Sequence, residues 1–166
     1  MDMNGVINQE SICENVEHIK SAAETYDIDS TLYVSLLWEE TRFNSDIKSY
    51  NGRACGISQV IPKWTSEYIK YKTQKQRKLE IKRVCDYYNS HVVDAIYEGA
   101  RILSLYKQYY KKTRIYLCGY NKGYRCDDKD ENKKTFKSGL SYADRILRFQ
   151  NRLKIAMRKT RRKLKY

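Results

Sequence analysis

Residues 40–49 read Glu-Thr-Arg-Phe-Asn-Ser-Asp-Ile-Lys-Ser, and a segment with helical spacing of apolar residues precedes them. Asp29 or Ser30 is a suitable N-cap for a helix over residues 31–42, whose leucines are spaced to face a core. Glu40 falls in the last turn of that helix. The negative end of the helix dipole raises the pKa of a carboxyl group there, so the position suits a proton donor.

The segment that follows has no helical period. Asparagine, serine and glycine residues between Phe43 and Ser58 predict an irregular loop or a small β excursion. Pro62 is expected in the first turn of a short helix that reaches to about Tyr71. Residues 73–89 are polar and basic, and their pattern leaves the secondary structure undecided.

Helical periodicity recurs along the rest of the chain. Apolar residues predict helices over 7–26, over 92–110, over 114–120 and from Ser141 onward, with a charged loop over 124–138. The chain has one proline and seven glycines, whereas an all-β protein of this length needs more turn residues. We therefore predict a mainly α single domain with helices around a long central helix at 92–110, in a chain of ordinary domain size.

The net charge of +13 is unevenly distributed. Residues 1–50 carry ten acidic and three basic residues, whereas residues 51–166 carry ten acidic and thirty basic ones. Such a basic region implies a polyanionic partner: nucleic acid, an anionic membrane surface, or a cell wall with carboxylates and phosphates. No stretch is apolar enough for a membrane span, and the N-terminus lacks the features of a secretory signal.

The five cysteines are odd in number and widely spaced, without a Cys-x-x-Cys pair, at positions 13, 55, 85, 118 and 126. A structural zinc site is not expected from this spacing, and we predict no metal and no cofactor. Buried thiols in a reducing compartment are the main expectation, with one or two disulfides as the alternative. We expect Cys55 to be a packing residue and not a nucleophile, since no histidine lies near it in sequence.

Three separated blocks carry the strongest functional signal. They are Glu40–Ser49, then Gly-Ile-Ser-Gln-Val-Ile-Pro at 56–62, then Gly-Tyr-Asn-Lys-Gly at 119–123 followed by Tyr142. They occur in the same order as in the soluble lytic transglycosylase family, with its goose-type lysozyme-like members, and the first block has the same internal spacing, so the chain resembles this family over about residues 25–150. The run between Ser49 and Gly56 is longer by one residue than is common in the family. The resemblance implies a lysozyme-like fold. Ser58 departs from it, because the family pattern has methionine there.

The resemblance also implies roles for individual residues. Glu40 would be the general acid/base, with Glu39 as an outward neighbour, and Ser49 would contact the sugar. The backbone of Gly56, Ile57 and Ser58, together with Gln59, would line the floor of the glycan groove. Tyr120 and Asn121 would face the catalytic carboxyl group, with Tyr142 near the start of the last helix.

The chemistry implied is cleavage of the bond between N-acetylmuramic acid and N-acetylglucosamine in peptidoglycan, leaving a 1,6-anhydro end. The first alternative is hydrolysis by a lysozyme-type muramidase, which needs a second carboxylate; Asp46 is the nearby candidate. The second alternative is a non-catalytic glycan-binding or virion module, and the third is a basic nucleic-acid-binding protein. The last leaves the three blocks unexplained.

The chain is expected to divide into a domain over 1–150 and a basic extension over 151–166, which has eight basic residues and no acidic one. This extension is either a solvated helix or a segment that binds anionic wall or lipid, and nucleic acid is the least favoured partner. We expect a monomer or a component of a phage particle. Such a protein would be made in the host cytoplasm and act on the wall as a virion enzyme or endolysin.

Overall fold

The computed structural model describes residues 9–44, 53–70, 73–126 and 134–163, and confirms the predicted mainly α fold. Within these ranges, β structure is limited to a single bridge between Cys55 and Val60, which is the small excursion expected after the second helix. The helices are α1 (Gln9–Thr25), α2 (Ser30–Thr41), α3 (Gln74–Ser90), α4 (Val92–Tyr110), α5 (Thr113–Lys122) and α6 (Lys134–Lys163), with two short 3-10 helices, η1 (Pro62–Trp64) and η2 (Gly123–Arg125).

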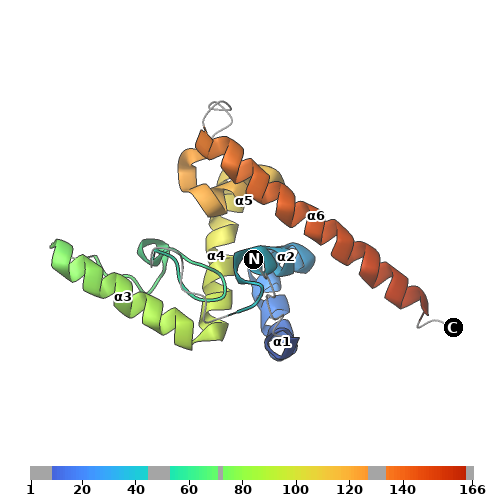
Figure 1. Ribbon diagram of the computed structural model, residues 1–166, viewed down its shortest axis with the longest axis horizontal. Coiled ribbons are helices and arrows are strands. Elements are labelled where there is room, and N and C mark those ends of the chain that lie inside the picture. Colours follow the sequence, from blue (N-terminus) through green and yellow to red (C-terminus); the bar gives the residue numbers. More distant parts are fainter. Residues whose placement is uncertain (1–8, 45–52, 71–72, 127–133, 164–166) are drawn as a thin grey trace, which may run out of the picture.

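Helix α4 is the central helix, with the predicted bounds. It packs against α1, α3 and α5, while α6 packs against α2 and α5 (Figure 1). Small residues on α4 allow the close approach of its neighbours. At Gly99, a Cβ atom would lie 2.5 Å from the Ser58 Cβ, so a larger residue would push the 55–60 loop away from α4.

Helix α2 begins and ends close to the predicted positions. The Asp29 side chain accepts a hydrogen bond from the Leu32 amide at 3.0 Å, which confirms Asp29 as the N-cap. Arg42 ends the helix in the left-handed conformation, and its amide donates to the Trp38 carbonyl. Leu36 and Leu37 are fully buried, so the predicted leucine face is anchored in the core.

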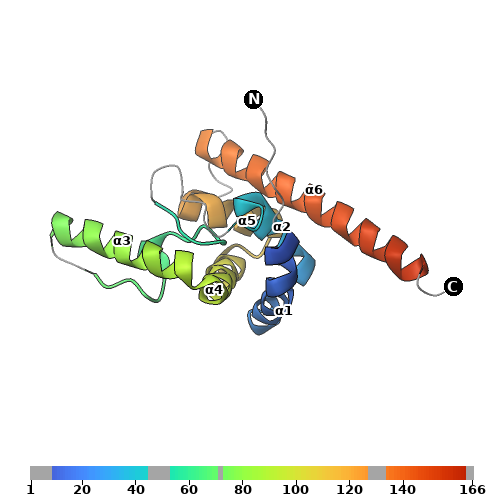
Figure 2. The same cartoon turned by 60° about the horizontal axis from the view of Figure 1, so that its bottom comes forward.

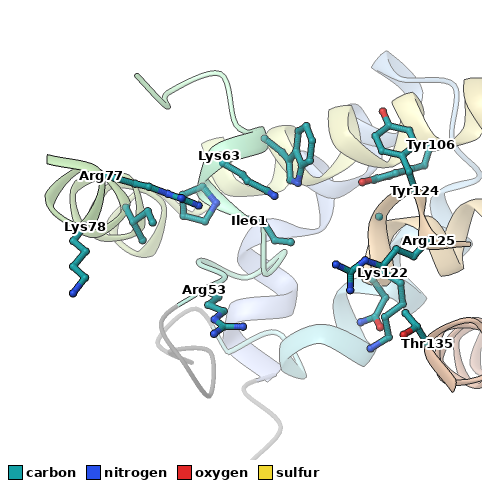
Figure 3. A pocket seen from close by; sticks show the side chains of 15 residues that line it. Arg53, Ile61, Lys63, Arg77, Lys78, Tyr106, Lys122, Tyr124, Arg125 and Thr135 are labelled. Carbon is teal, nitrogen blue, oxygen red and sulfur yellow. The ribbon is translucent and has the colours of Figure 1, made fainter. Parts of the chain in front are cut away.

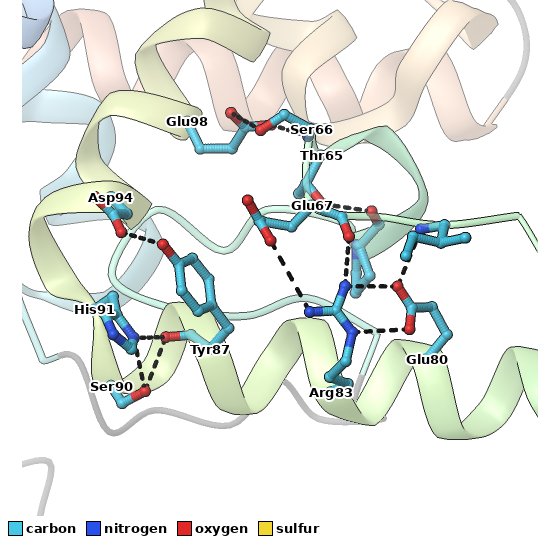
Figure 4. A network of polar contacts seen from close by, with 12 residues as sticks. Thr65, Ser66, Glu67, Glu80, Arg83, Tyr87, Ser90, His91, Asp94 and Glu98 are labelled. Atoms are coloured by element: carbon cyan, nitrogen blue, oxygen red, sulfur yellow. Dashed lines mark hydrogen bonds and ion pairs between the residues drawn. The ribbon is translucent and has the colours of Figure 1, made fainter.

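The helix expected from Pro62 to Tyr71 is wrong in its extent, because η1 ends at Trp64. Carboxylate side chains accept from backbone amides beyond it. The Ser66 amide donates to Glu98 at 2.8 Å and the Ile69 amide to Glu80 at 3.0 Å (Figure 4). These contacts hold residues 65–70 in an irregular path across α3 and α4.

One segment that the sequence left undecided is a helix, and one predicted helix begins earlier than expected. Residues 74–90 form α3, whose start has a capping box in which Thr73 and Gln76 bond each other's backbone amides. Helix α6 begins at Lys134 and not near Ser141, because Phe136 is buried beside α5. Gly139 also lies against α5: a Cβ atom there would be 2.3 Å from the Cys118 sulfur.

The C-terminal half of α6 extends beyond the rest of the protein (Figure 2). The helix runs through residue 150 without interruption, and residues 155–163 are exposed. Among the described helices, none is long and apolar enough to cross a membrane.

Candidate active site

Glu40 lies in the last turn of α2, where that helix meets α6 and the 55–60 loop. The next residue, Thr41, is buried and donates from its hydroxyl to the Ile57 carbonyl at 2.9 Å, which ties the end of α2 to the loop. From α6, the buried Tyr142 donates its phenolic hydrogen to Oε1 of Glu40. Glu40 itself remains partly exposed, so a substrate can reach it.

The environment of Glu40 favours its protonated form. The pKa of Glu40 is raised to about 7, and burial of the carboxyl group is the main cause. The hydrogen bond from Tyr142 lowers this pKa, the negative charge of Glu39 raises it, and the positive charge of Lys122 lowers it. A carboxyl group with a pKa near 7 can both donate and accept a proton at neutral pH, as a general acid/base must.

The adjacent Glu39 has a different environment. Its Oε1 accepts from Nε of Arg145 at 2.6 Å, and its Oε2 lies 3.9 Å from Nη1 of Arg42. Its side chain is 15% exposed, so it is less outward than predicted. Because Glu39 is paired with Arg145 and Glu40 is bonded to a neutral hydroxyl, only Glu40 suits a proton donor.

The 55–60 loop is a tight turn closed by two hydrogen bonds between the backbones of Cys55 and Val60. Gly56 has a φ of +66°, and a Cβ atom there would lie 2.9 Å from the Tyr88 carbonyl oxygen and from the Ala95 Cβ. Its amide donates to Oδ1 of Asn89 at 2.8 Å. Glycine is thus required at 56 both by conformation and by the closeness of α3 and α4.

Two predicted groove residues occupy core positions. The side chains of Ile57 and Ser58 are fully buried, and Ser58 donates from its hydroxyl to the Ala95 carbonyl at 2.8 Å. Their side chains therefore support the loop, and the lining of a groove by the backbone of residues 56–58 stays a prediction. Gln59 is partly exposed, and its amide nitrogen donates to the Gly56 carbonyl at 3.1 Å.

The resemblance implied that Tyr120 faces the catalytic carboxyl group, but its hydroxyl bonds the backbone and not Glu40. Tyr120 is buried and donates to the Ser58 carbonyl at 2.7 Å, joining α5 to the loop. The tyrosine that bonds Glu40 is Tyr142. Asn121 is partly exposed and lines the adjacent cavity described below. Ser49 and Asp46 lie outside the described residues.

A cavity of about 890 Å³ opens beside the end of α5 (Figure 3). Its walls come from η1, α3, α4, α5 and η2, and Lys122 belongs both to its wall and to the electrostatic surroundings of Glu40. Aromatic rings are present on one side: Tyr124 contacts Trp64 and Tyr106, with ring centroids 6.3 and 5.5 Å apart. Aromatic walls with polar edges suit sugar rings.

The aromatic wall residues were not identified from the sequence, because tyrosine is frequent throughout this chain and only the fold brings these rings together. Trp64 follows the Pro62 block by two residues, which was the available signal. Its backbone is fixed from α4: Nη2 of Arg101 donates to the Trp64 carbonyl at 2.8 Å and to Glu98 at 2.7 Å. The α4 helix thereby holds the cavity wall in place.

Four cysteines form two disulfides. The main expectation of buried free thiols is therefore wrong, and the alternative of one or two disulfides is what the structure has. Cys55 pairs with Cys85 and Cys118 with Cys126, while Cys13 is free and exposed. The first bond joins the 55–60 loop to α3, and the second encloses residues 119–125, which include Asn121 and part of the cavity wall. Sequence spacing did not reveal these pairs because tertiary folding brings Cys55 and Cys85 together.

In the described part of the chain, no group of three or more His, Cys, Asp or Glu residues could hold a metal ion. In a comparison with known protein families, the profile described as the Transglycosylase SLT domain matches residues 17–142. No curated protein and no solved structure shows significant similarity to the chain. The match covers Glu40, the 56–62 block, the Tyr120-Asn121 pair and Tyr142. The predicted family is thereby confirmed: the chain belongs to the transglycosylase SLT domain family, whose activity is lytic cleavage of peptidoglycan.

Proposed function

We propose that this protein cleaves the β-1,4 bond between N-acetylmuramic acid and N-acetylglucosamine in peptidoglycan, with Glu40 as the single general acid/base. The observation that carries the proposal is the placement of Glu40: a partly exposed carboxyl group with a pKa raised to about 7, bonded to a neutral tyrosine and not to a cation. Family membership supports peptidoglycan as the substrate.

In the first step, protonated Glu40 donates its proton to the glycosidic oxygen while the bond to the muramoyl C1 breaks. Because Oε1 accepts from Tyr142, the other carboxyl oxygen is the one that would carry this proton. The substrate's own acetamido group stabilises the positive charge that develops at C1. The N-acetylglucosamine side of the chain leaves as an alcohol.

In the second step, the Glu40 carboxylate removes the proton from the C6 hydroxyl of the same muramoyl residue, and that oxygen bonds to C1. The product is a 1,6-anhydro-muramoyl end, and the proton from the C6 hydroxyl leaves Glu40 protonated again. No water is consumed. The positive charge of Lys122 favours the carboxylate form that this step requires.

Hydrolysis is the competing outcome and needs a second carboxylate to position water or act as a nucleophile. Glu39 does not suit this role, because it is paired with Arg145 at 2.6 Å. This pairing favours the lyase reaction. Asp46, the other candidate from the sequence, lies outside the described residues.

We also propose that the protein acts on the wall outside a reducing compartment, as a virion enzyme or endolysin. The two disulfides support this setting, because such bonds persist under oxidising conditions. The exposed basic residues at the end of α6 support an additional contact with anionic wall material or lipid.

The decisive experiment combines one variant with product analysis. Glu40→Gln keeps the shape of the side chain but cannot donate a proton, and we expect about 10²- to 10⁴-fold slower release of soluble muropeptides from purified peptidoglycan. Mass spectrometry of the wild-type products should show 1,6-anhydro ends. Reducing ends throughout would identify a hydrolase, and full activity of Glu40→Gln would remove Glu40 from the mechanism.

A further inference from the structure

The cavity at the end of α5, whose wall includes Lys122, has a strongly basic lining. Six of its fifteen lining residues are lysine or arginine and none is aspartate or glutamate: Arg53, Lys63, Arg77, Lys78, Lys122 and Arg125. Neutral sugar rings require hydrogen bonds and aromatic contacts, and they do not require this amount of positive charge. The lining therefore indicates a ligand that carries negative charge in addition to sugar.

The basic residues surround the cavity and do not converge on one point. Arg77 and Lys78 project from α3 on one side, and Lys122 and Arg125 lie on the opposite side (Figure 3). Arg77, Lys78 and Arg125 form no ion pair with any acidic residue in the described part of the chain. Their charges are thus available to a ligand, and their separation suits several single charges more than one compact phosphate group.

We propose that this cavity binds the carboxylates of the stem peptides carried by the muramoyl residues, so that the enzyme selects peptide-bearing glycan over bare glycan. The aromatic side, Trp64 with Tyr106 and Tyr124, takes the sugar chain, while Arg77 and Lys78 on α3 take the carboxylates of a stem. This inference rests on the proposed function. It assigns α3 a role in choosing the substrate that is separate from the chemistry at Glu40.

Binding is tested with full-length Glu40→Gln protein, which should not consume the ligand. Calorimetry at low salt compares soluble glycan chains with stems, the same chains after an amidase has removed the stems, and stem-bearing chains whose carboxylates have been converted to amides. We expect the first ligand to bind about tenfold more tightly than either of the others, since two or more charge contacts of ordinary strength are lost.

The variant Arg77→Gln/Lys78→Gln in the same background should reduce the preference to about twofold or less, since the α3 charges supply most of it. The matched control is Lys75→Gln/Lys137→Gln, which removes two exposed charges that do not line the cavity and should keep the preference. Thermal unfolding of each variant verifies that it is folded.

Equal binding of the three ligands would overturn the proposal, as would a preference that survives loss of Arg77 and Lys78. Tighter binding of poly(glycerol phosphate) than of stem-bearing glycan would instead assign the cavity to a phosphate polymer. Failure of the proposed function gives a different result. If wild-type protein releases no muropeptides from purified peptidoglycan, the proposed function fails, while the binding comparison still decides whether stems are recognised.

Discussion

Two regions of the molecule contain glutamates with limited access to water, and the partners of these glutamates differ. On α3, Glu80 is 3% exposed and receives two hydrogen bonds from Arg83, from Nη2 at 2.7 Å and from Nε at 2.9 Å (Figure 4). At the end of α2, Glu40 receives its hydrogen bond from the neutral Tyr142.

The pKa values of the two glutamates are shifted in opposite directions. The hydrogen bonds from Arg83 lower the pKa of Glu80, so that it stays ionised and acts as a structural anchor for residues 67–69. Burial raises the pKa of Glu40 to about 7, and the hydrogen bond from Tyr142 and the charge of Lys122 lower this pKa by less than burial raises it. The comparison teaches that burial alone does not define a catalytic acid; the charge of the hydrogen-bond donor decides.

The largest effect on stability should come from removing Arg83, the cation that pairs with Glu80. Arg83→Met leaves the Glu80 carboxylate buried without its bidentate partner, and we expect the free energy of unfolding to fall by about 1 to 3 kcal/mol at pH 7, measured by urea denaturation. A carboxylate whose folded-state pKa is lowered stabilises the protein above its unfolded pKa and loses this effect as pH falls through the folded pKa. The difference should therefore shrink in acid.

The matched control for Arg83→Met is Lys82→Met, one residue away on the same helix. It breaks an exposed pair, Lys82 with Asp86 at 2.6 Å, and should change stability by less than about 0.5 kcal/mol. If both variants lose equal stability, the Glu80 site has no special role. If Arg83→Met also shifts the pH dependence of catalysis, the two regions are not independent.

We expect Glu40→Gln to have a smaller effect on the free energy of unfolding, and to stabilise the protein where Arg83→Met destabilises it. A carboxyl group with a raised folded-state pKa contributes stability that is present below its unfolded pKa and is lost as pH rises through about 7. Wild type should therefore lose stability between about pH 4.5 and 7, whereas the glutamine variant should not. Above pH 7, we expect the variant to be more stable by about 1 to 2 kcal/mol.

Thermal unfolding of both proteins at pH 4 and pH 8 measures this difference. The exposed Glu24→Gln on α1 is the control and should behave as wild type at both values. A Glu40→Gln variant that is less stable than wild type at pH 8 would contradict the raised pKa and with it the role of Glu40 as an acid.

The smallest effects concern the pH dependence of cleavage. Tyr142→Phe keeps the ring and removes a hydrogen bond that lowers the pKa of Glu40, so the alkaline limb of the activity profile should move to higher pH. Glu39→Gln removes a negative charge that raises this pKa, so the same limb should move to lower pH. Profiles of kcat/KM on soluble glycan measure both shifts, and shifts of equal sign would exclude Glu40 as the titrating group.

Local signals in the sequence determined most of the helices. Asp29 as the cap of α2 and the periodic apolar residues of 92–110 each depend on residues close together in the chain, and so does the pattern within each of the three blocks. For the same reason the position of Glu40 in the last turn of a helix followed from the sequence. Such features are set by hydrogen bonds and side-chain spacing within a few residues.

The tertiary structure alone decided which side chains meet. Tyr142 bonds Glu40 across 102 positions of the chain, Tyr120 instead bonds the Ser58 carbonyl, and Cys55 joins Cys85. The basic residues of the cavity come from the loop before η1, from η1 and α3, and from the adjoining α5 and η2. These contacts depend on how whole helices pack, and packing is set by the fit of buried surfaces that no short stretch of sequence contains.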